Sequence, residues 1–304
     1  MKKIIIGSRG SKLALLYAEK AKQCLLNSSN LSIDEIEIKK IVTKGDQVQD
    51  KRLSEVGGKG LFSKNIENEL LDKKIDIAVH ALKDMPAIET EGLVTNCFLK
   101  RNDPREVLIS RSGKNINDIK SNAIIGTSSF RREFQINNLR KNLKPKLIRG
   151  NVDTRIQKLK DGEYDAIILS LAGLSFLKLE NQVSQIFSTD EIIPSAGQGI
   201  IALQSRNDDD YIKSLLENIN DTETAIKANS ERKVLKVLEG DCETAVGVYS
   251  NIENGQITLK AELFSLNGQQ KFYESGSSDI NNGEELGLEI GKKLKLKAGN
   301  NYKK

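Results

Sequence analysis

The sequence predicts an α/β protein with two lobes built on mixed sheets, followed by a small α+β domain. Short apolar runs alternate with helical patterns through the first two hundred residues, which is typical of parallel or mixed sheets with helices on both faces. After a long helical pattern near residue 230, the rhythm changes to strand–turn–strand. We therefore expect one lobe over 1–99 with 200–219, a second over 100–199, and a C-terminal domain over 220–304.

In the first lobe, apolar runs and helical spacing predict three strands and two helices. Leu13, Leu16 and Ala21 share the spacing of one helical face. The segment Gly45–Gly60 is long, charged and glycine-rich, which fits a mobile lid or an ordinary loop equally well. The predicted strands are Ile4–Ile6, Ile36–Val42 and Ile75–His80, and the helices are Ser11–Leu26 and Leu61–Leu71.

The second lobe continues the alternation and ends in a return connection. The run Ile193–Gly199 contains proline and two glycines, the residues of turns, and leads into a strand at Ile200–Gln204. We expect this run to carry the chain back between the lobes. The predicted strands are Val107–Ser110, Ala123–Gly126, Leu147–Arg149 and Ala166–Leu171, and the helices are Phe130–Leu139 and Val152–Leu159.

The C-terminal part reads as helix, three strands, helix. Asn-Gly pairs at 254–255 and 267–268 mark two hairpins, because this dipeptide suits the tight turns that join antiparallel strands. The predicted helices are Thr222–Leu238 and Glu284–Leu296, and the strands are Thr244–Tyr249, Gln256–Ala261 and Lys271–Ser275.

Composition excludes several classes of protein. A net charge of +5 from 47 basic and 42 acidic residues is too mild for wrapping DNA, and an aromatic content of 5% without Trp argues against stacking on bases. Cys24, Cys97 and Cys242 form no metal-spaced pair, so we expect no metal site and a reducing compartment. The first apolar run is too short for a signal peptide and no stretch could span a membrane, which predicts a cytoplasmic protein.

Two adjacent arginines, Arg131 and Arg132, are the most informative local feature. They follow the strand that ends in Gly126 and open a helix, next to Ser129 in a Gly/Ser-containing turn. A helix N-terminus favours anions and disfavours cations, so arginines at this position require a reason. Two guanidinium groups there would suit a carboxylate or phosphate ligand, whereas a solvated charged turn is the plainer interpretation.

Two further strand-to-helix corners carry arginine. Arg149 and Arg155 flank the turn that contains Gly150, and Arg9 precedes Ser11 after the first strand. Because the carboxyl ends of strands meet at one edge of such sheets, we expect these corners to converge. Together with Lys59 and Lys83 they predict an extended basic pocket for a polycarboxylate, or for a ligand that grows.

Asp84 is the candidate catalytic residue. It follows Lys83 in a tight turn after a buried strand, with Pro86 ending the local helix. A carboxylate in a cationic pocket can stabilise a developing positive charge and relay protons, although a residue that merely bonds the turn is an equal alternative. The single histidine, His80, ends an apolar run and is expected to be a core residue.

Cys242 differs from the other two cysteines. Cys24 lies in an amphipathic helix and Cys97 in an apolar run, whereas Cys242 follows Gly240-Asp241 in a predicted loop, where a thiol can react. The flanking Asp241 and Glu243 would raise its pKa, which suits a covalent anchor better than a nucleophile. Three alternatives stay open on these residues: a solute-binding protein for a polyanion, a nucleic-acid-binding protein, and a hydrolase pairing Cys242 with His80.

At this point the chain resembles the porphobilinogen deaminase family, also called hydroxymethylbilane synthase, over nearly its whole length. The family is indicated by several motifs in the same order along the chain. These are Val56–Phe62, Asp76–Pro86, Gly126–Arg132, Arg149–Arg155, Gly162–Ala166, Pro194–Gly199 and the loop around Cys242.

The resemblance implies an enzyme of porphyrin (heme) biosynthesis. Such transferases join four porphobilinogen units head to tail onto a dipyrromethane primer, releasing ammonia each time, and then hydrolyse off the linear tetrapyrrole. It implies that Cys242 holds the primer through a thioether, that Asp84 is catalytic, and that Lys59 belongs to a flexible lid. The expected cofactor-binding residues are Lys83, Ser129, Arg131, Arg132 and Gly150, and the expected substrate-binding residues are Arg9, Ser11, Arg149 and Arg155.

The resemblance also implies lobes like those of periplasmic solute-binding proteins, a monomer, and hand-over of the product to uroporphyrinogen-III synthase. The chain departs from the family pattern at three places. Phe176 follows the Ala-Gly-Leu turn where many members have an arginine, Ala81 replaces a serine, and Asp241 and Glu243 flank Cys242. One carboxylate contact and the pace of primer loading are therefore in question.

Overall fold

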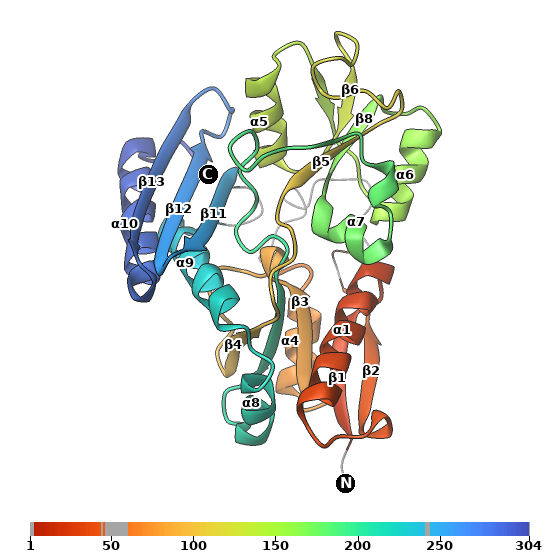
Figure 1. The fold of residues 1–304 in the computed structure, drawn as a ribbon, viewed down its shortest axis with the longest axis vertical. Helices are drawn as coiled ribbons and strands as arrows, with labels where there is room; N and C mark the ends of the chain where they lie inside the picture. Colours follow the sequence, from red (N-terminus) through yellow and green to blue (C-terminus); the bar gives the residue numbers. More distant parts are fainter. Residues whose placement is uncertain (1–2, 44, 46–59, 241–243, 304) are drawn as a thin grey trace.

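The structure is a computed structural model that describes residues 3–43, 45, 60–240 and 244–303. Within these residues it contains two five-stranded sheets and one three-stranded sheet. Figure 1 shows the two larger sheets in an upper and a lower lobe, with the third sheet and its helices beside them. This arrangement confirms the predicted fold class of two mixed α/β lobes and a small α+β unit.

The sheet of the first lobe has the order β2-β1-β3-β10-β4. Three of its strands are parallel, and β10 runs antiparallel to both of its neighbours. Helices α1 and α8 cover one face and α4 the other. The strands are β1 (Ile4–Arg9), β2 (Ile36–Ile41), β3 (Ile77–Ala81), β4 (Leu93–Phe98) and β10 (Ile201–Arg206), and the helices are α1 (Lys12–Ser28), α4 (Lys64–Leu71) and α8 (Asp210–Glu217).

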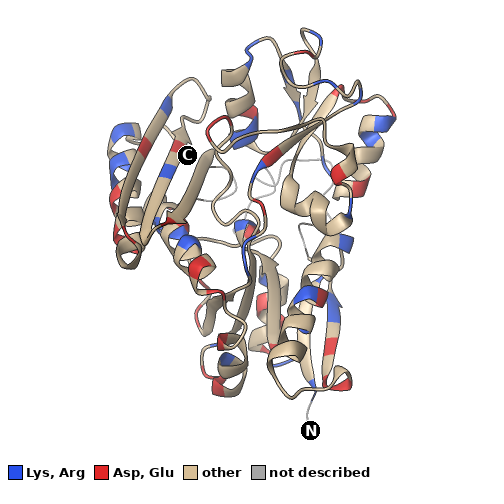
Figure 2. Ribbon diagram, viewed as in Figure 1, with Lys and Arg blue, Asp and Glu red and all other residues tan. Residues whose placement is uncertain are grey.

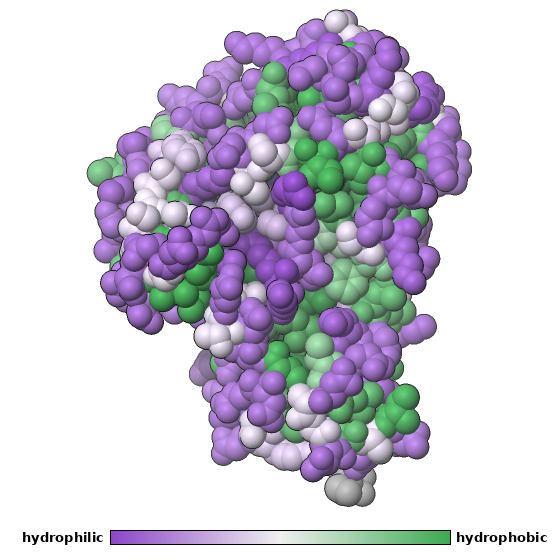
Figure 3. All heavy atoms as spheres, in the orientation of Figure 1, coloured by the Kyte–Doolittle hydropathy of each residue, from purple (hydrophilic) through white to green (hydrophobic). Residues whose placement is uncertain are grey.

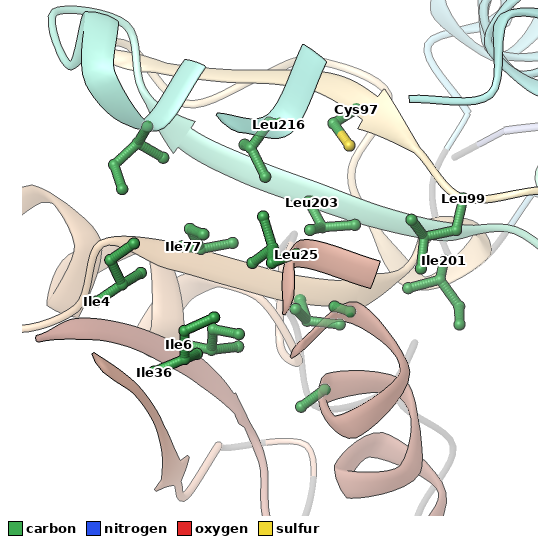
Figure 4. Close-up of a cluster of buried hydrophobic side chains, with 14 residues drawn as sticks. Ile4, Ile6, Leu25, Ile36, Ile77, Cys97, Leu99, Ile201, Leu203 and Leu216 are labelled. Carbon is green, nitrogen blue, oxygen red and sulfur yellow. The ribbon is translucent and has the colours of Figure 1, made fainter. Parts of the chain in front are cut away.

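The core of this lobe lies between the sheet and helices α1 and α8. Figure 4 shows Leu25 from α1 and Leu216 from α8 close to the strand residue Leu203. All three side chains are at most 1% exposed. Cys97, which Figure 4 also labels, is 1% exposed in the same cluster, and Cys24 packs against it, as the sequence predicts for packing residues.

The sheet of the second lobe repeats this plan in the order β7-β6-β8-β5-β9. Its first three strands are parallel, and β5 is antiparallel to β8 and β9. Helix α5 packs on one face and α6 and α7 on the other. The strands are β5 (Glu106–Ser110), β6 (Ile124–Gly126), β7 (Lys144–Lys146), β8 (Ala166–Ser170) and β9 (Gln185–Ile186), and the helices are α5 (Phe130–Leu139), α6 (Val152–Lys160) and α7 (Leu171–Leu177).

The chain crosses between the lobes twice, and each crossing delivers the antiparallel strand of the lobe it enters. The first crossing leads from β4 to β5, and the second leads from β9 to β10. The lobes also share one hydrogen bond. In the first lobe the Asp76 carboxylate accepts the backbone N–H of Ile5 at 3.0 Å, and in the second lobe the Asp165 carboxylate accepts that of Ile124 at 2.9 Å. The two lobes therefore share one plan and are joined by two crossings of the chain.

The third sheet, β11-β12-β13, is antiparallel and is covered by α9 and α10. Asn254 and Gly255 join its first two strands with φ of 51° and 74°, the left-handed pair that a tight hairpin turn requires. Gly287 and Gly291 face α9, where an added Cβ would meet atoms at 2.3 and 2.9 Å. The elements are α9 (Thr222–Leu238), β11 (Val246–Glu253), β12 (Gln256–Phe264), β13 (Lys271–Asp279) and α10 (Gly283–Ala298).

The structure corrects the sequence-based elements at several points. The strand predicted at Leu147–Arg149 is wrong, because β7 lies three residues earlier and the carbonyl of Leu147 accepts the Tyr164 hydroxyl at 2.6 Å. The helix predicted from Leu61 begins at Lys64, after a turn at Gly60. Strands β4 and β9 and helices α7 and α8 are additional elements. The glycine-rich segment Gly45–Gly60 lies outside the described residues except at its two ends.

Short 3-10 helices complete the described chain. They are η1 (Ile33–Glu35), η2 (Leu82–Asp84), η3 (Glu180–Gln182) and η4 (Ile280–Asn282). Only η2 bears on the site, because it follows β3 and carries Lys83 and Asp84. The tight turn predicted there is therefore confirmed.

Candidate active site

A cavity of about 530 Å³ lies between the two lobes. It is lined by the corner after β1, by η2, and by the corners that open α5 and α6, so the three arginine-bearing corners converge as predicted. Every predicted site residue that the structure describes lines this one cavity. These are Arg9, Ser11, Lys83, Asp84, Ser129, Arg131, Arg132, Arg149, Gly150 and Arg155. Lys59 and Cys242 lie outside the described residues.

The positive charge of the cavity is a local feature. Figure 2 shows acidic and basic residues mixed over all three parts of the fold. In the cavity wall, by contrast, cations outnumber the two carboxylates: the basic lining residues are Arg9, Lys12, Lys83, Arg131, Arg132, Arg149 and Arg155, and the acidic ones are Asp84 and Asp153. Such a cavity attracts a ligand with several negative charges.

Three helices, α1, α5 and α6, begin at the wall of this cavity. The hydroxyl of Ser11 accepts the N–H of Ala14 at the start of α1, and the hydroxyl of Ser129 accepts the N–H of Arg132 at the start of α5, at 3.3 and 3.4 Å. These serines are N-caps, which fixes where each helix begins. Gly150 has a φ of +110°, a conformation that side-chain-bearing residues rarely adopt, before α6 begins. The helix dipoles therefore add to the attraction for anions.

Glu106 explains why Arg131 and Arg132 stand at a helix N-terminus. Its fully buried carboxylate accepts from Arg131 at 2.7 Å, and from Arg132 at 3.0 and 2.8 Å through Nε and Nη2. Arg131 also donates to the carbonyl of Ile193 and Arg132 to the carbonyl of Ile168. The two guanidinium groups are thus held in fixed orientations at the cavity wall, 5% and 7% exposed.

Sequence reasoning missed Glu106. Burial alone would raise the pKa of this carboxyl, but Arg132 and Arg131, with a smaller effect from Lys83, lower its pKa to about 2. It is therefore ionised at neutral pH and is the common counter-ion of the arginine pair. The available signal was the charged residue that starts an otherwise apolar run, Glu106–Ser110, which follows Asp103-Pro104-Arg105.

Lys83 and Asp84 stand at the carboxyl end of β3. The Lys83 ammonium donates to the side-chain oxygen of Gln198 at 3.1 Å. Burial, with a smaller contribution from Arg132, lowers the pKa of Lys83 to about 8. The Asp84 side chain is 37% exposed, and its Oδ2 lies 3.9 Å from Nη1 of Arg9, whose guanidinium stacks 3.9 Å above the Phe62 ring. Asp84 therefore faces the cavity beside one arginine rather than being buried in its own turn.

Arg149 and Arg155 supply the far side of the cavity. Burial lowers the pKa of Arg155 to about 10, with Arg132 and Arg149 adding to the effect. Burial, followed by Arg9, also lowers the pKa of Arg149. Crowding of like charges without enough carboxylates is unfavourable, so an anionic ligand would relieve it.

Three contacts tie the parts of the fold together around the cavity. Phe176 of α7 meets Tyr17 of α1 edge to face, with ring centroids 4.8 Å apart, and so links the two lobes where the sequence pattern lacks an arginine. Figure 3 shows apolar side chains gathered on the face of the molecule where α7 and α1 meet. Gln135 of α5 donates to Glu262 of β12 at 2.9 Å, and Arg101 pairs with Glu231 of α9 at 2.6 Å.

His80 is buried at 7% exposure, as predicted for a core residue. Burial lowers its pKa to about 4, which keeps the imidazole neutral at physiological pH. Within the described residues, no group of three or more His, Cys, Asp or Glu is arranged to hold a metal ion. The described helices include none with the length and apolar composition needed to cross a membrane.

The geometry defines a class of protein: a two-lobed α/β protein whose cleft holds many cations around the accessible carboxylate of Asp84. Family models agree and are more specific. The model "Porphobilinogen deaminase, dipyromethane cofactor binding domain" matches residues 4–214, and "Porphobilinogen deaminase, C-terminal domain" matches residues 225–296. The chain belongs to the porphobilinogen deaminase family, whose cofactor is a dipyrromethane.

Curated relatives cover nearly the whole chain. Porphobilinogen deaminase of Bacillus cereus is 44% identical over 305 residues, covering 97% of this chain and 94% of the relative. The enzyme of Nitrobacter hamburgensis is 39% identical over 297 residues, covering 98% and 94%. Among solved structures, the Bordetella pertussis BvgS periplasmic VFT2 domain is 12% identical, with 76% of this chain and 91% of that chain covered and a TM-score of 0.44.

Proposed function

We propose that this chain is a hydroxymethylbilane synthase that condenses four porphobilinogen units head to tail and releases ammonia at each addition. Hydrolysis then frees the linear product. The observation that carries this proposal is the cleft itself, in which Asp84 is surrounded by arginine and lysine side chains from both lobes. Each porphobilinogen unit brings two carboxylates, so a growing chain needs such an excess of positive charge.

The residues of the cleft fit a dipyrromethane. Two pyrrole units carry four carboxylates. The cavity wall offers hydrogen-bond donors to them from Lys83, Arg131, Arg132, Arg149 and Arg155. When bound, the cofactor supplies the free pyrrole position to which the first substrate is joined. We assign Cys242 as its covalent anchor, Ser129 and Gly150 as neighbours that present backbone and hydroxyl groups, and Arg9 and Ser11 to the incoming substrate. Lys59 is assigned to a lid.

Asp84 is assigned the catalytic role. Loss of ammonia from the substrate leaves a methylene carbon conjugated with the pyrrole nitrogen, and this group carries a positive charge. A carboxylate near the pyrrole N–H groups lowers the energy of that cation and can accept the proton displaced when the new carbon–carbon bond forms. Nη1 of Arg9 lies 3.9 Å from Oδ2 of Asp84, which is longer than a close ion pair. The carboxylate of Asp84 therefore stays available to the substrate.

We also propose the domain division 1–99 with 200–219, 100–199, and 220–304, which is supported by the separate sheets and their hydrophobic clusters. In this division the C-terminal domain carries the cofactor cysteine. We further propose that the enzyme acts as a monomer in the cytoplasm and hands its product to uroporphyrinogen-III synthase. Size-exclusion chromatography with light scattering would test the monomer.

One rival has a specific observation in its favour. A polyanion-binding protein without chemistry would share the two lobes and the arginines. It gives no reason for an accessible Asp84 among the cations, nor for a domain that carries a cysteine loop. Release of ammonia from porphobilinogen would exclude it.

The first test is the intact mass of the purified protein beside Cys242→Ser. We expect an excess equal to two porphobilinogen units without their amines, and we expect it to be absent from the variant. A wild-type mass that stays unmodified after incubation with porphobilinogen would favour the solute-binding alternative.

Asp84→Ala separates catalysis from cofactor binding. We expect turnover to fall by at least about a hundredfold, the lower range of a general acid–base contribution, while the mass still shows the cofactor. Ammonia release at the wild-type rate from the Asp84→Ala protein would overturn the catalytic assignment.

A further inference from the structure

A second cavity of about 60 Å³ opens beside Asp84. It shares five lining residues with the large cavity, Arg9, Ser11, Leu13, Phe62 and Asp84, so it is a side pocket of the proposed active site. Its remaining wall comes from three elements: Tyr17 of α1, Ser63 at the start of α4, and His80 near the end of β3. The side pocket thus lies on the side of the first lobe, away from the arginine pair of α5.

Two polar atoms in this wall lack a hydrogen-bond partner among the described residues. They are Oγ of Ser63, a residue 1% exposed, and Nε2 of His80, a residue 7% exposed. Ser63 precedes α4 but its side chain makes no capping bond. A buried polar atom without a partner costs on the order of 1–3 kcal/mol, so a small molecule that bonds to both atoms would be stabilised.

The size of the side pocket restricts the occupant. About 60 Å³ holds one or two molecules of the size of water or ammonia. It cannot hold a pyrrole ring with its two acid side chains. The side chains that line it offer the hydroxyls of Ser11, Tyr17 and Ser63, the imidazole of His80, the carboxylate of Asp84 and the guanidinium of Arg9. Burial keeps the imidazole neutral, with its pKa lowered to about 4 despite the opposing effect of the neighbouring Gln204 side chain, so a ring nitrogen can accept a hydrogen bond.

We propose that this side pocket receives the ammonia released at each condensation, an inference that rests on the proposed function. In that reaction the C–N bond of the protonated aminomethyl group breaks, and its electron pair leaves with the nitrogen as ammonia. The methylene carbon then bonds to the α-carbon of the acceptor pyrrole. The proton displaced from that carbon passes through Asp84 to ammonia, so one ammonium ion leaves for each new carbon–carbon bond.

The position of the side pocket would separate the released ammonia from the electrophilic carbon. Ammonia is a nucleophile and would recombine with the electrophilic carbon if it stayed in the main cavity. Asp84 borders both cavities, so it can face the cation on one side and the departing nitrogen on the other. Ser63, His80 and Asp84 together offer acceptors to three of the four N–H groups of an ammonium ion, and the charge of Asp84 offsets that of Arg9 in the same wall.

The test measures how ammonium affects turnover of the cofactor-loaded enzyme. Porphobilinogen consumption is followed at saturating substrate in ammonium chloride, potassium chloride or tetramethylammonium chloride at equal ionic strength. We expect ammonium to inhibit the wild type, and we expect potassium and the oversized tetramethylammonium to have little effect. Ser63→Val removes the hydroxyl and fills the side pocket, so half-inhibition should need about fivefold more ammonium, the equivalent of one hydrogen bond.

The control is Ser28→Val, the same substitution at an exposed position at the far end of α1, which should keep the wild-type response. Ala14→Val narrows the side pocket from α1 and serves as a second variant if Ser63→Val does not fold. Equal effects of ammonium and potassium, or equal ammonium sensitivity of the wild type and the filled variants, would overturn the proposal. A wild-type enzyme that releases neither ammonia nor bilane would instead overturn the proposed function.

Discussion

At the scale of single residues, Glu106 is the group on which the basic wall of the cleft depends. It is the only carboxylate that any described hydrogen bond or ion pair gives to both Arg131 and Arg132. Two buried guanidinium groups without it would repel each other and lose their orientation. The carboxylate of Glu106, at the start of β5, offsets the unfavourable position of the two arginines at the N-terminus of α5.

Glu106→Gln should destabilise the protein by about 3–5 kcal/mol, because it leaves two buried cations without a counter-ion. Urea unfolding would measure this loss, and intact mass would report a reduced fraction of cofactor-loaded protein. The conservative Glu106→Asp should restore part of both. A depressed pKa near 2 means that this carboxylate stabilises the wild type above about pH 4.5, and that the contribution is lost as the pH falls toward 2. Glu106→Gln should lack that acid-dependent step.

Lys83 sets a limit at alkaline pH. Since its pKa is lowered to about 8, the free enzyme loses this positive charge as the pH rises through 8. We expect kcat/KM for porphobilinogen to decline above that pH, because kcat/KM reports groups of the free enzyme. Lys83→Arg should move the decline to higher pH. The same decline in both proteins would assign the titration to another group.

The effect of Lys83 on the stability of the fold has the opposite pH dependence. A lysine whose folded-state pKa lies below its usual 10.5 destabilises the fold while it is charged. That cost is fully present below about pH 8 and disappears as the pH rises from 8 toward 10.5. Substrate binding and stability should therefore respond to alkaline pH in opposite directions at this one residue.

At the scale of elements, α5 links the arginine pair to the C-terminal sheet. Gln135 accepts from Arg131 at 3.2 Å and donates to Glu262 of β12 at 2.9 Å, and the two residues are 3% and 6% exposed. Lys271 of β13 approaches Glu262 at 3.0 Å. Helix α5 is thus fixed at one end by Glu106 and along its length by the sheet of the proposed cofactor domain.

Gln135→Leu should destabilise the protein by about 1–3 kcal/mol, because Glu262 and Arg131 each lose a buried hydrogen-bond partner. Thermal or urea unfolding would measure it. Gln157→Leu is the matched control: it removes an exposed bond to Asp161 on the neighbouring helix α6, and should change stability by no more than about 0.5 kcal/mol. Equal losses in the two variants would show that the link through α5 is unimportant.

At the scale of the whole molecule, one buried carboxylate joins helix α9, which packs on the third sheet, to both crossings between the lobes. Glu231 is fully buried and accepts from Arg101 on the first crossing and from the N–H of Gly197 on the second, at 2.6 and 2.8 Å. Ser250 of β11 donates to it through its N–H and its hydroxyl. The positions of all three parts therefore depend on a single charge.

Glu231→Gln should cost about 3–5 kcal/mol of unfolding free energy, since Arg101 stays buried without its counter-ion. Glu285→Gln, on the exposed face of α10, is the control and should fall within about 0.5 kcal/mol of the wild type. Calorimetry would compare their transition temperatures. A Glu231→Gln transition as high as that of the control would show that the parts are held by packing alone.

Much of this architecture could be predicted from the sequence because periodicity is a local signal. Helices Phe130–Leu139 and Thr222–Leu238 have the predicted bounds, and the arginine corners meet at one cavity as predicted. Helix α7 was not predicted, because the predicted strand Ala166–Leu171 extends through β8 into the first residue of the helix and mostly apolar residues follow. Glu106 was not predicted as a site residue because its partners lie about 25 residues further along the chain, and only the folded sheet brings them together.

The two crossings also determine the order in which the chain can complete its sheets during synthesis. All five strands of the upper sheet lie between residues 106 and 186, so a ribosome releases that sheet as one uninterrupted stretch. The first strand of the lower sheet begins at residue 4. Strand β10, which lies between β3 and β4 in that sheet, is made last and emerges only with residues 201–206. The amino-terminal lobe therefore waits, with β3 and β4 unjoined, while the lobe made after it can already have folded.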